Sequence, residues 1–214
     1  MFHLKESFAK IARSTPAIAA TLALAAIPIV GMIVSHEREG VRYATMTRDP
    51  IVVLHGSVST GFLSTLGGLL WAAAVGACAV SAFRRDFDRD VRRFFLFGGA
   101  LTAWLMADDV FLFHERVLPI YFGVEEKFVH AAYPILCAAF LVFSRRTILA
   151  GDWPMLGAAL SFFAASEICD ALIGEDSDVF FLIEDGAKFL GIALWLAYFV
   201  RSGSARSRAA SAAS

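Results

Sequence analysis

Apolar residues gather in six long blocks along this chain, and short polar segments separate the blocks. A helix needs roughly 20 mostly apolar residues to cross the hydrocarbon core of a bilayer. The blocks cover residues 16–34, 57–83, 94–113, 128–143, 154–173 and 179–200. Thr15 and Pro16 are residues typical of the N-cap and of the first helical position, so the first helix is expected to start there. The pattern predicts an all-α integral membrane protein, a bundle of six transmembrane helices.

The two ends of the chain add little to this organisation. No A-x-A cleavage site follows the first block, which favours an uncleaved first span over a signal peptide. Residues 201–214 are rich in Ser, Ala and Arg and are expected to form a disordered cytoplasmic tail. Residues 1–200 are therefore interpreted as a single transmembrane domain.

Composition supports a membrane protein. Of the 214 residues, 58% are hydrophobic and only 18% are charged, and the mean hydropathy is +0.65. The net charge of −1 gives no support for nucleic-acid binding. Cys78, Cys137 and Cys169 lie in three different blocks without CxxC spacing, so we interpret them as small buried hydrophobic residues.

Basic residues define an orientation. Most of the 19 lysine and arginine residues lie in the N-terminal segment, in the arginine-rich segment 84–93, at 145–146 and in the C-terminal tail. These segments fall on one side of a six-span bundle, so the positive-inside rule predicts that both termini are cytoplasmic. We expect the cell inner (plasma) membrane, with the acidic side facing the periplasm or the exterior.

Ionisable residues accompany the last four blocks, and all of them fall at the predicted outer end. Charges in hydrocarbon cost several kcal/mol each, so such residues are functional candidates by default. They are Asp108, Asp109, His114, Glu115, Glu126, His130, Glu167, Asp170, Glu184, Asp185 and Lys188.

Sequence spacing predicts which of these residues share a helix face in the third and fourth blocks. Asp108 and Glu115 are seven residues apart, about two turns, and are expected to share one face. Glu126 and His130 stand at i, i+4, a spacing that suits a metal ion in helical carboxylate sites. Alternatives stay open for both sets. The aspartates could cap the helix end or pair with Arg116, and the second pair could be a helix-start acid beside an interfacial histidine.

Two further pairs lie in the fifth and sixth blocks. Glu167 and Asp170, at i, i+3, have no basic residue on their own helix, so their repulsion requires a cation or a shared proton. Lys188 follows Glu184 at i+4 and is too deep in its block for routine snorkelling. An internal salt bridge between Glu184 and Lys188 is the simpler alternative for the sixth block.

The first functional hypothesis is a metal-dependent membrane hydrolase acting on a lipid or other amphipathic substrate. Glu184 or Glu126 would shuttle protons and Lys188 would stabilise developing negative charge. A divalent ion, zinc or iron-like, would activate water. Its candidate ligands are Asp108, Asp109, His114, Glu126, His130, Glu167 and Asp170. The architecture resembles that of the intramembrane ceramidases and adiponectin-receptor-like hydrolases. Those proteins have seven helices and a His-x-x-x-His motif, both missing here, so none of their residues is transferred.

Other hypotheses use the same residues. Acids, histidines and lysines inside a bundle are also typical of proton or cation transporters and channels. Glu184-x-x-x-Lys188 resembles the Schiff-base helix of microbial rhodopsins, which would imply retinal or another cofactor on Lys188. An accessory subunit is the fourth hypothesis. In each case the lipid bilayer is a partner, and a homo-oligomer or a partner membrane subunit is possible.

Overall fold

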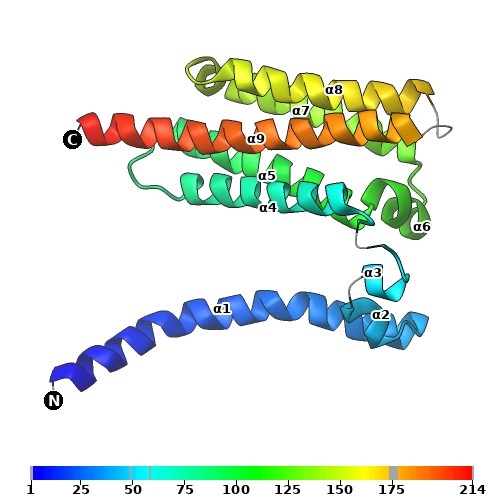
Figure 1. The fold of residues 1–214 in the computed structure, drawn as a ribbon. Coiled ribbons are helices and arrows are strands. Elements are labelled where there is room, and N and C mark those ends of the chain that lie inside the picture. Colours follow the sequence, from blue (N-terminus) through cyan, green and yellow to red (C-terminus); the bar gives the residue numbers. More distant parts are fainter. Residues whose placement is uncertain (1, 49, 58, 174–177, 214) are drawn as a thin grey trace. The chain divides into compact units, whose positions relative to one another are not determined.

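The computed structural model describes residues 2–48, 50–57, 59–173 and 178–213, and every element in this part of the chain is a helix (Figure 1). The prediction of an all-α protein is thereby confirmed. The chain divides into two compact units, Met1–Thr60 and Gly61–Ser214, called unit 1 and unit 2 below. Four helical segments are long and apolar enough to cross a membrane: Ile18–Glu39, Phe62–Ala82, Arg89–Phe111 and Ala131–Leu149.

Unit 1 contains one long helix and two short ones. Helix α1 spans Phe2–Glu39, and α2 and α3 span Tyr43–Thr47 and Pro50–Val53. Helix α1 therefore begins well before the expected start at Pro16. Gly40 follows it with a φ of +68°, the left-handed conformation that commonly terminates helices.

Unit 2 holds five long helices, which lie side by side (Figure 1). They are α4 (Phe62–Ala82), α5 (Arg89–Phe111), α7 (Glu126–Leu149), α8 (Trp153–Ile173) and α9 (Asp178–Ala213). Consecutive long helices run in opposite directions. Helix α9 packs against both α4 and α8, and α5 packs against α4 and α7. All starts and ends of the helices therefore fall at one of two ends of the unit.

Local signals explain two of these boundaries. Helix α4 begins at Phe62 rather than near residue 57, because Gly61 just before it adopts a left-handed conformation with φ +64°. Helix α5 begins after Asp88, whose side chain accepts a hydrogen bond of 2.8 Å from the Val91 N–H. This contact satisfies one of the N–H groups that a helix start leaves unpaired.

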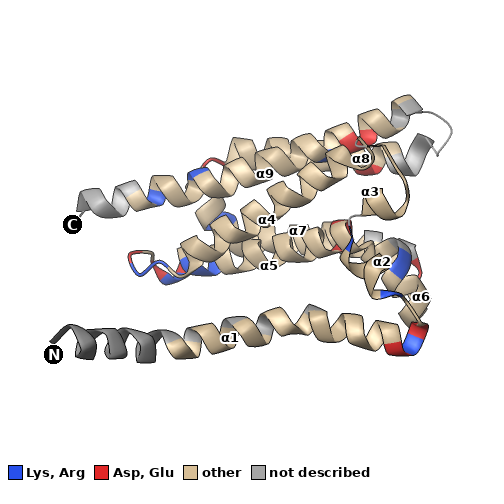
Figure 2. Cartoon of the chain, turned by 60° about the horizontal axis from the view of Figure 1, so that its bottom comes forward, with Lys and Arg blue, Asp and Glu red and all other residues tan. Residues whose placement is uncertain are grey.

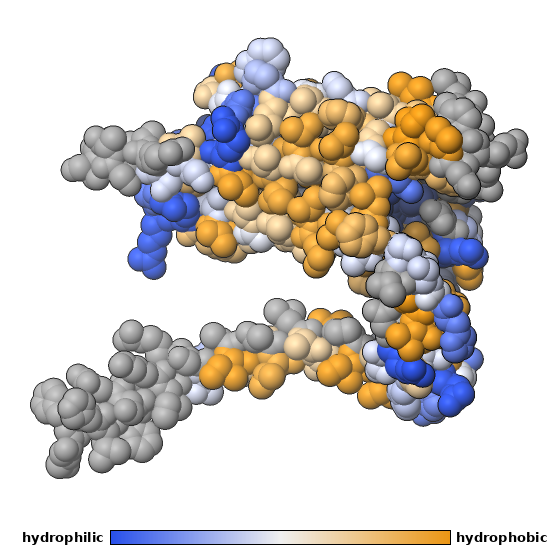
Figure 3. Space-filling model, in the orientation of Figure 1, coloured by the Kyte–Doolittle hydropathy of each residue, from blue (hydrophilic) through white to orange (hydrophobic). Residues whose placement is uncertain are grey.

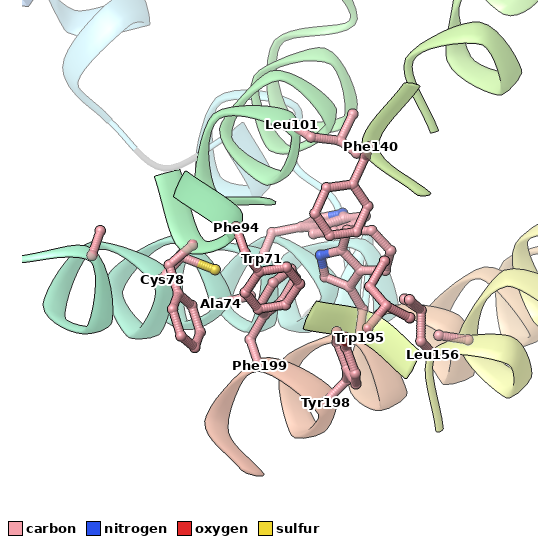
Figure 4. Packing of buried hydrophobic residues seen from close by; sticks show 14 of the residues in the cluster. Trp71, Ala74, Cys78, Phe94, Leu101, Phe140, Leu156, Trp195, Tyr198 and Phe199 are labelled. Atoms are coloured by element: carbon pink, nitrogen blue, oxygen red, sulfur yellow. The ribbon is translucent and has the colours of Figure 1, made fainter. Parts of the chain in front are cut away.

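An aromatic core joins the helices of unit 2, and Trp195, Tyr198 and Phe199 of α9 belong to it (Figure 4). The Trp195 ring is 5.3 Å from Phe199 on the same helix and 6.0 Å from Phe140 on α7. Phe94 on α5 lies 5.6 Å from Phe199. Such offset and edge-on ring pairs contribute about 0.5–1.5 kcal/mol each beyond their buried area.

A buried chain of hydrogen bonds links α9 to α5. Trp195 Nε1 donates to Thr102 Oγ1 at 2.9 Å, and Thr102 Oγ1 donates to the Gly98 carbonyl at 2.6 Å. In hydrocarbon no water competes for these groups, so the bonds favour one arrangement of α5 and α9.

Large apolar side chains cover the outside of the helices (Figure 3). Val80, Phe83, Phe143 and Leu149 are between 69% and 80% exposed. Contiguous apolar surface on this scale is typical of contact with lipid or another protein.

The segment expected to be a disordered tail is helical. Residues 201–213 continue α9 in the structure. The Arg206 side chain donates a hydrogen bond to the Thr147 carbonyl near the end of α7, and the Ser207 hydroxyl accepts one from Arg84 in the turn after α4. Ala and Arg have high helix propensity, and an existing helix extends without a new nucleation step. The prediction of disorder overlooked this advantage.

The core predicts a specific packing defect. A Cβ added at Gly98 would lie 2.6 Å from the Phe199 ring. We expect Gly98→Ala to lower the free energy of unfolding by about 1–3 kcal/mol, the usual cost of overpacking. Thermal unfolding in mild detergent measures this loss. Gly157→Ala is the matched control, because a Cβ there meets nothing within 4 Å. Equal midpoints for both variants would contradict the described packing.

Candidate functional site

The candidate residues of the last four blocks lie at one end of unit 2. The end of α5, the start of α7, the end of α8 and the start of α9 meet there, and acidic residues lie on these segments (Figure 2). The side chains of Glu115, Glu126, His130 and Asp170 lie outside the described part of the structure. The site is therefore built here from the other candidates.

Helix α5 ends inside the predicted third block. It stops at Phe111, and Leu112 adopts a left-handed conformation with φ +52°. The chain continues as a π-helix, η1, over Phe113–Val117, followed by α6 over Leu118–Phe122. The prediction that Asp108 and Glu115 share one face of a continuous helix is therefore wrong, because the helix ends between them.

Asp108 organises this break. Its side chain is buried, and its Oδ1 accepts a 2.9 Å hydrogen bond from the backbone N–H of His114. Its Oδ2 lies 2.7 Å from His114 Nδ1. An ionised carboxylate only accepts hydrogen bonds, so Nδ1 carries the proton and donates it. Both the turn and the orientation of the imidazole ring are thereby fixed.

Tyr133 completes this group and was not among the predicted site residues. Its ring meets the His114 ring edge-on, with centroids 6.5 Å apart. It also lies close enough to Asp108 for electrostatic interaction. One sequence signal pointed to it: Tyr133 follows His130 by three residues, so both lie on the same face of α7.

A second ionic contact joins α5 to α9. Lys188 Nζ forms an ion pair with Asp109 Oδ1, and the Asp109 side chain is only 14% exposed. Lys188 therefore has an ionic partner on another helix, α5, in addition to its neighbours on α9. A cavity of about 40 Å³ adjoins the pair, and Ser64, Gly67 and Asp185 are among its lining residues. This volume suits about one water molecule.

Glu167 on α8 is exposed. It lies within electrostatic range of Tyr133 and Cys137 on α7. Among the side chains that the structure describes, no group of three His, Cys, Asp or Glu residues is placed to hold a metal ion. The predicted ligands Glu126, His130 and Asp170 are not in that set, so the metal site stays a prediction.

The ion pair between α5 and α9 predicts a non-additive effect on stability. Asp109→Asn leaves the Lys188 ammonium without this partner and should cost about 1–3 kcal/mol of unfolding free energy. The double variant Asp109→Asn/Lys188→Met removes both charges and should be more stable than Asp109→Asn alone. Chemical denaturation of the two single variants and the double variant measures the coupling. Strictly additive losses would show that the pair contributes nothing.

The comparisons with known proteins identify a family without assigning an activity. No curated protein and no solved structure matches the chain. A family described as Domain of unknown function (DUF8692) matches residues 17–202, which is most of the sequence and includes every candidate residue above. The chain belongs to the DUF8692 family.

Proposed function

We propose that this chain is a six-span inner-membrane protein with both termini in the cytoplasm. Helices α8 and α9 would be the fifth and sixth spans. The antiparallel order of the helices in unit 2 supports this topology, because it places the arginine-rich turns at the end opposite the acidic candidate residues of the site (Figure 2). The positive-inside rule then assigns the arginine-rich end to the cytoplasm.

Reporter fusions test the topology. Green fluorescent protein fused after Ser214 should fluoresce, since it folds in the cytoplasm. Alkaline phosphatase inserted after Gly123, between α6 and α7, should be active, since it requires an oxidising exterior compartment. An inactive phosphatase inserted after Gly123, together with an active phosphatase fused after Ser214, would reverse the assignment.

We propose further that the acidic end is the catalytic site of a metal-dependent hydrolase acting on a lipid or another amphipathic substrate. The observation that carries this proposal is the contact of both Asp108 oxygen atoms with His114. A carboxylate on Nδ1 fixes the tautomer and leaves the lone pair on Nε2, the arrangement typical of metal-ligating histidines. Asp108 then orients a ligand instead of binding the ion directly.

The remaining roles follow from position at the same end. His130, Glu126, Glu167 and Asp170 are the residues proposed to complete the ligand set with His114. A bound zinc or iron-like ion would supply Lewis acidity and lower the pKa of a water molecule. Lys188 would stabilise negative charge that develops on the substrate, with Asp109 holding its ammonium in place. Glu184 is the candidate proton carrier.

The dimensions of the Lys188 environment do not favour a chromophore. Its adjoining cavity measures about 40 Å³, whereas pockets for small organic ligands usually measure about 300–1,000 Å³. We therefore do not propose retinal as a cofactor.

Metal content tests the hydrolase proposal. Elemental analysis of protein purified in mild detergent should find about one or two divalent ions per chain. Asp108→Asn should lower metal affinity by about 10–100-fold, because it removes the group that orients His114. His36→Gln on α1 is the control and should bind metal normally.

Two results together would overturn this proposal. The first is a metal-free protein, and the second is an unfolding midpoint that a chelator leaves unchanged. Proton or cation flux in liposomes, lost in Glu167→Gln, would then favour a transport function for the same residues.

A further inference from the structure

A large groove lies at the arginine-rich end of unit 2, opposite the acidic site. Its volume is about 1680 Å³. Three parts of the chain line it: the end of α4 with the turn into α5 and the first residues of α5, the end of α7 with the turn into α8, and residues 200–207 of α9. The proposed membrane topology explains why arginines gather at this end, but it does not explain why a cavity lies there.

Two arginines of the groove are already neutralised by carboxylates. Arg84 donates to both oxygen atoms of Asp86, at 3.0 and 2.6 Å, and also to Ser207 Oγ at 2.7 Å. Arg201 Nε donates to Asp152 at 2.7 Å. These contacts hold the walls of the groove and leave little net charge on them.

Arg206 differs from those two. Its Nη2 donates to the Thr147 carbonyl at 2.7 Å, and its guanidinium lies 5.6 Å from the centre of the Phe94 ring. Among the described residues neither Arg206 nor the neighbouring Arg146 forms a salt bridge with a carboxylate, although Asp88, which also lines the groove, lies within electrostatic range of Arg206. Burial lowers the pKa of the Arg206 guanidinium. A partly buried cation that no carboxylate contacts directly favours binding of an anion from outside the chain.

Two serine hydroxyl groups add to the polar part of the groove, which contains Arg206 and Arg146. Ser81 and Ser202 line the groove and are only 7% and 5% exposed. Guanidinium forks and hydroxyl donors together are the groups that bind phosphate oxygens in proteins.

The other part of the groove is apolar. Gly76, Ala77 and Val80 of α4 and Val200 of α9 line it. Val80 is 71% exposed and belongs to the apolar surface along the helices. Figure 3 shows hydrophilic residues at this end of the unit beside that apolar surface. The lining therefore changes within one groove from apolar residues to a charged part, in which Arg206 and Arg146 lie together with Asp88 and Asp90. An amphiphile with a phosphate headgroup requires such a change from apolar to polar surface.

We propose that this groove binds an anionic phospholipid. Its phosphate group contacts Arg206 and Arg146, and an acyl chain lies along the apolar part between α4 and α9. Basic pockets between spans on the cytoplasmic side are the usual sites for such headgroups. The site is separate from the proposed hydrolase centre, and its test does not depend on catalysis.

Native mass spectrometry of the full chain in mild detergent tests the proposal with phosphatidylglycerol and phosphatidylcholine as probes. We expect one phosphatidylglycerol to bind about tenfold more tightly than phosphatidylcholine. Arg206→Gln and Arg146→Gln should each raise the dissociation constant for phosphatidylglycerol about tenfold. Arg145→Gln is the matched control, since Arg145 is exposed and does not line the groove. Arg146 is also exposed, so its variant remains informative if Arg206→Gln does not fold.

A second variant separates a lipid from a soluble phosphate. A Cβ at Gly76 meets nothing within 4 Å, so α4 tolerates Gly76→Leu while the side chain fills the apolar part. Phosphatidylglycerol binding should weaken in this variant and inorganic phosphate binding should not. Equal affinity for the two lipids, or arginine variants that match Arg145→Gln, would overturn the proposal. The proposal would also be overturned, in favour of a soluble phosphate ligand, if inorganic phosphate displaced phosphatidylglycerol completely and Gly76→Leu left lipid binding unchanged.

Discussion

A buried side-chain contact between α5 and α9 links the two groups of helices in unit 2, since α5 packs against α4 and α7 and α9 packs against α4 and α8. An apolar helix gains little by leaving lipid for another apolar helix, so association in a membrane depends on close packing and buried hydrogen bonds. Trp195 provides both, because its ring lies in the aromatic core and its N–H donates to Thr102. Gly98 permits the approach, since the Phe199 ring occupies the space that a side chain there would need. Both ionic ends of the unit take their geometry from helices positioned in this way.

The hydrophobic pattern predicted the helices far better than it predicted the contacts between them. The blocks correspond to helices because length and apolar content are local properties that a sequence displays directly. The end of α5 could not be predicted, because Leu112 lies in an apolar run with no glycine or proline to mark a break. The break depends on hydrogen bonds from His114 to Asp108 that form only once the chain has turned. The contact of Lys188 with Asp109 is also tertiary, whereas sequence spacing offered only Glu184 and Asp185 of the same helix as neighbours.

The two ends of unit 2 use charge in different ways. At the acidic end, Asp108 and Asp109 are each in contact with a basic side chain of the same chain, so these carboxylates are held in fixed orientations. At the other end, Arg84 and Arg201 are held by aspartates, but Arg206 is held by a carbonyl oxygen and a ring. Fixed carboxylates suit chemistry on a cation or proton, whereas an arginine held by neutral groups keeps its full charge for a ligand.

Helix α9 runs unbroken through both ends. Its 36 residues correspond to a rod about 54 Å long at a rise of about 1.5 Å per residue, well beyond the hydrocarbon thickness of about 30 Å. Lys188 and Arg206 are thereby separated by about 27 Å along one rod. A rigid helix moves as a body, so a displacement at Lys188 arrives at Arg206 without any relay of side chains between them. In the six-span topology proposed above, Lys188 and Arg206 would lie toward opposite faces of the bilayer.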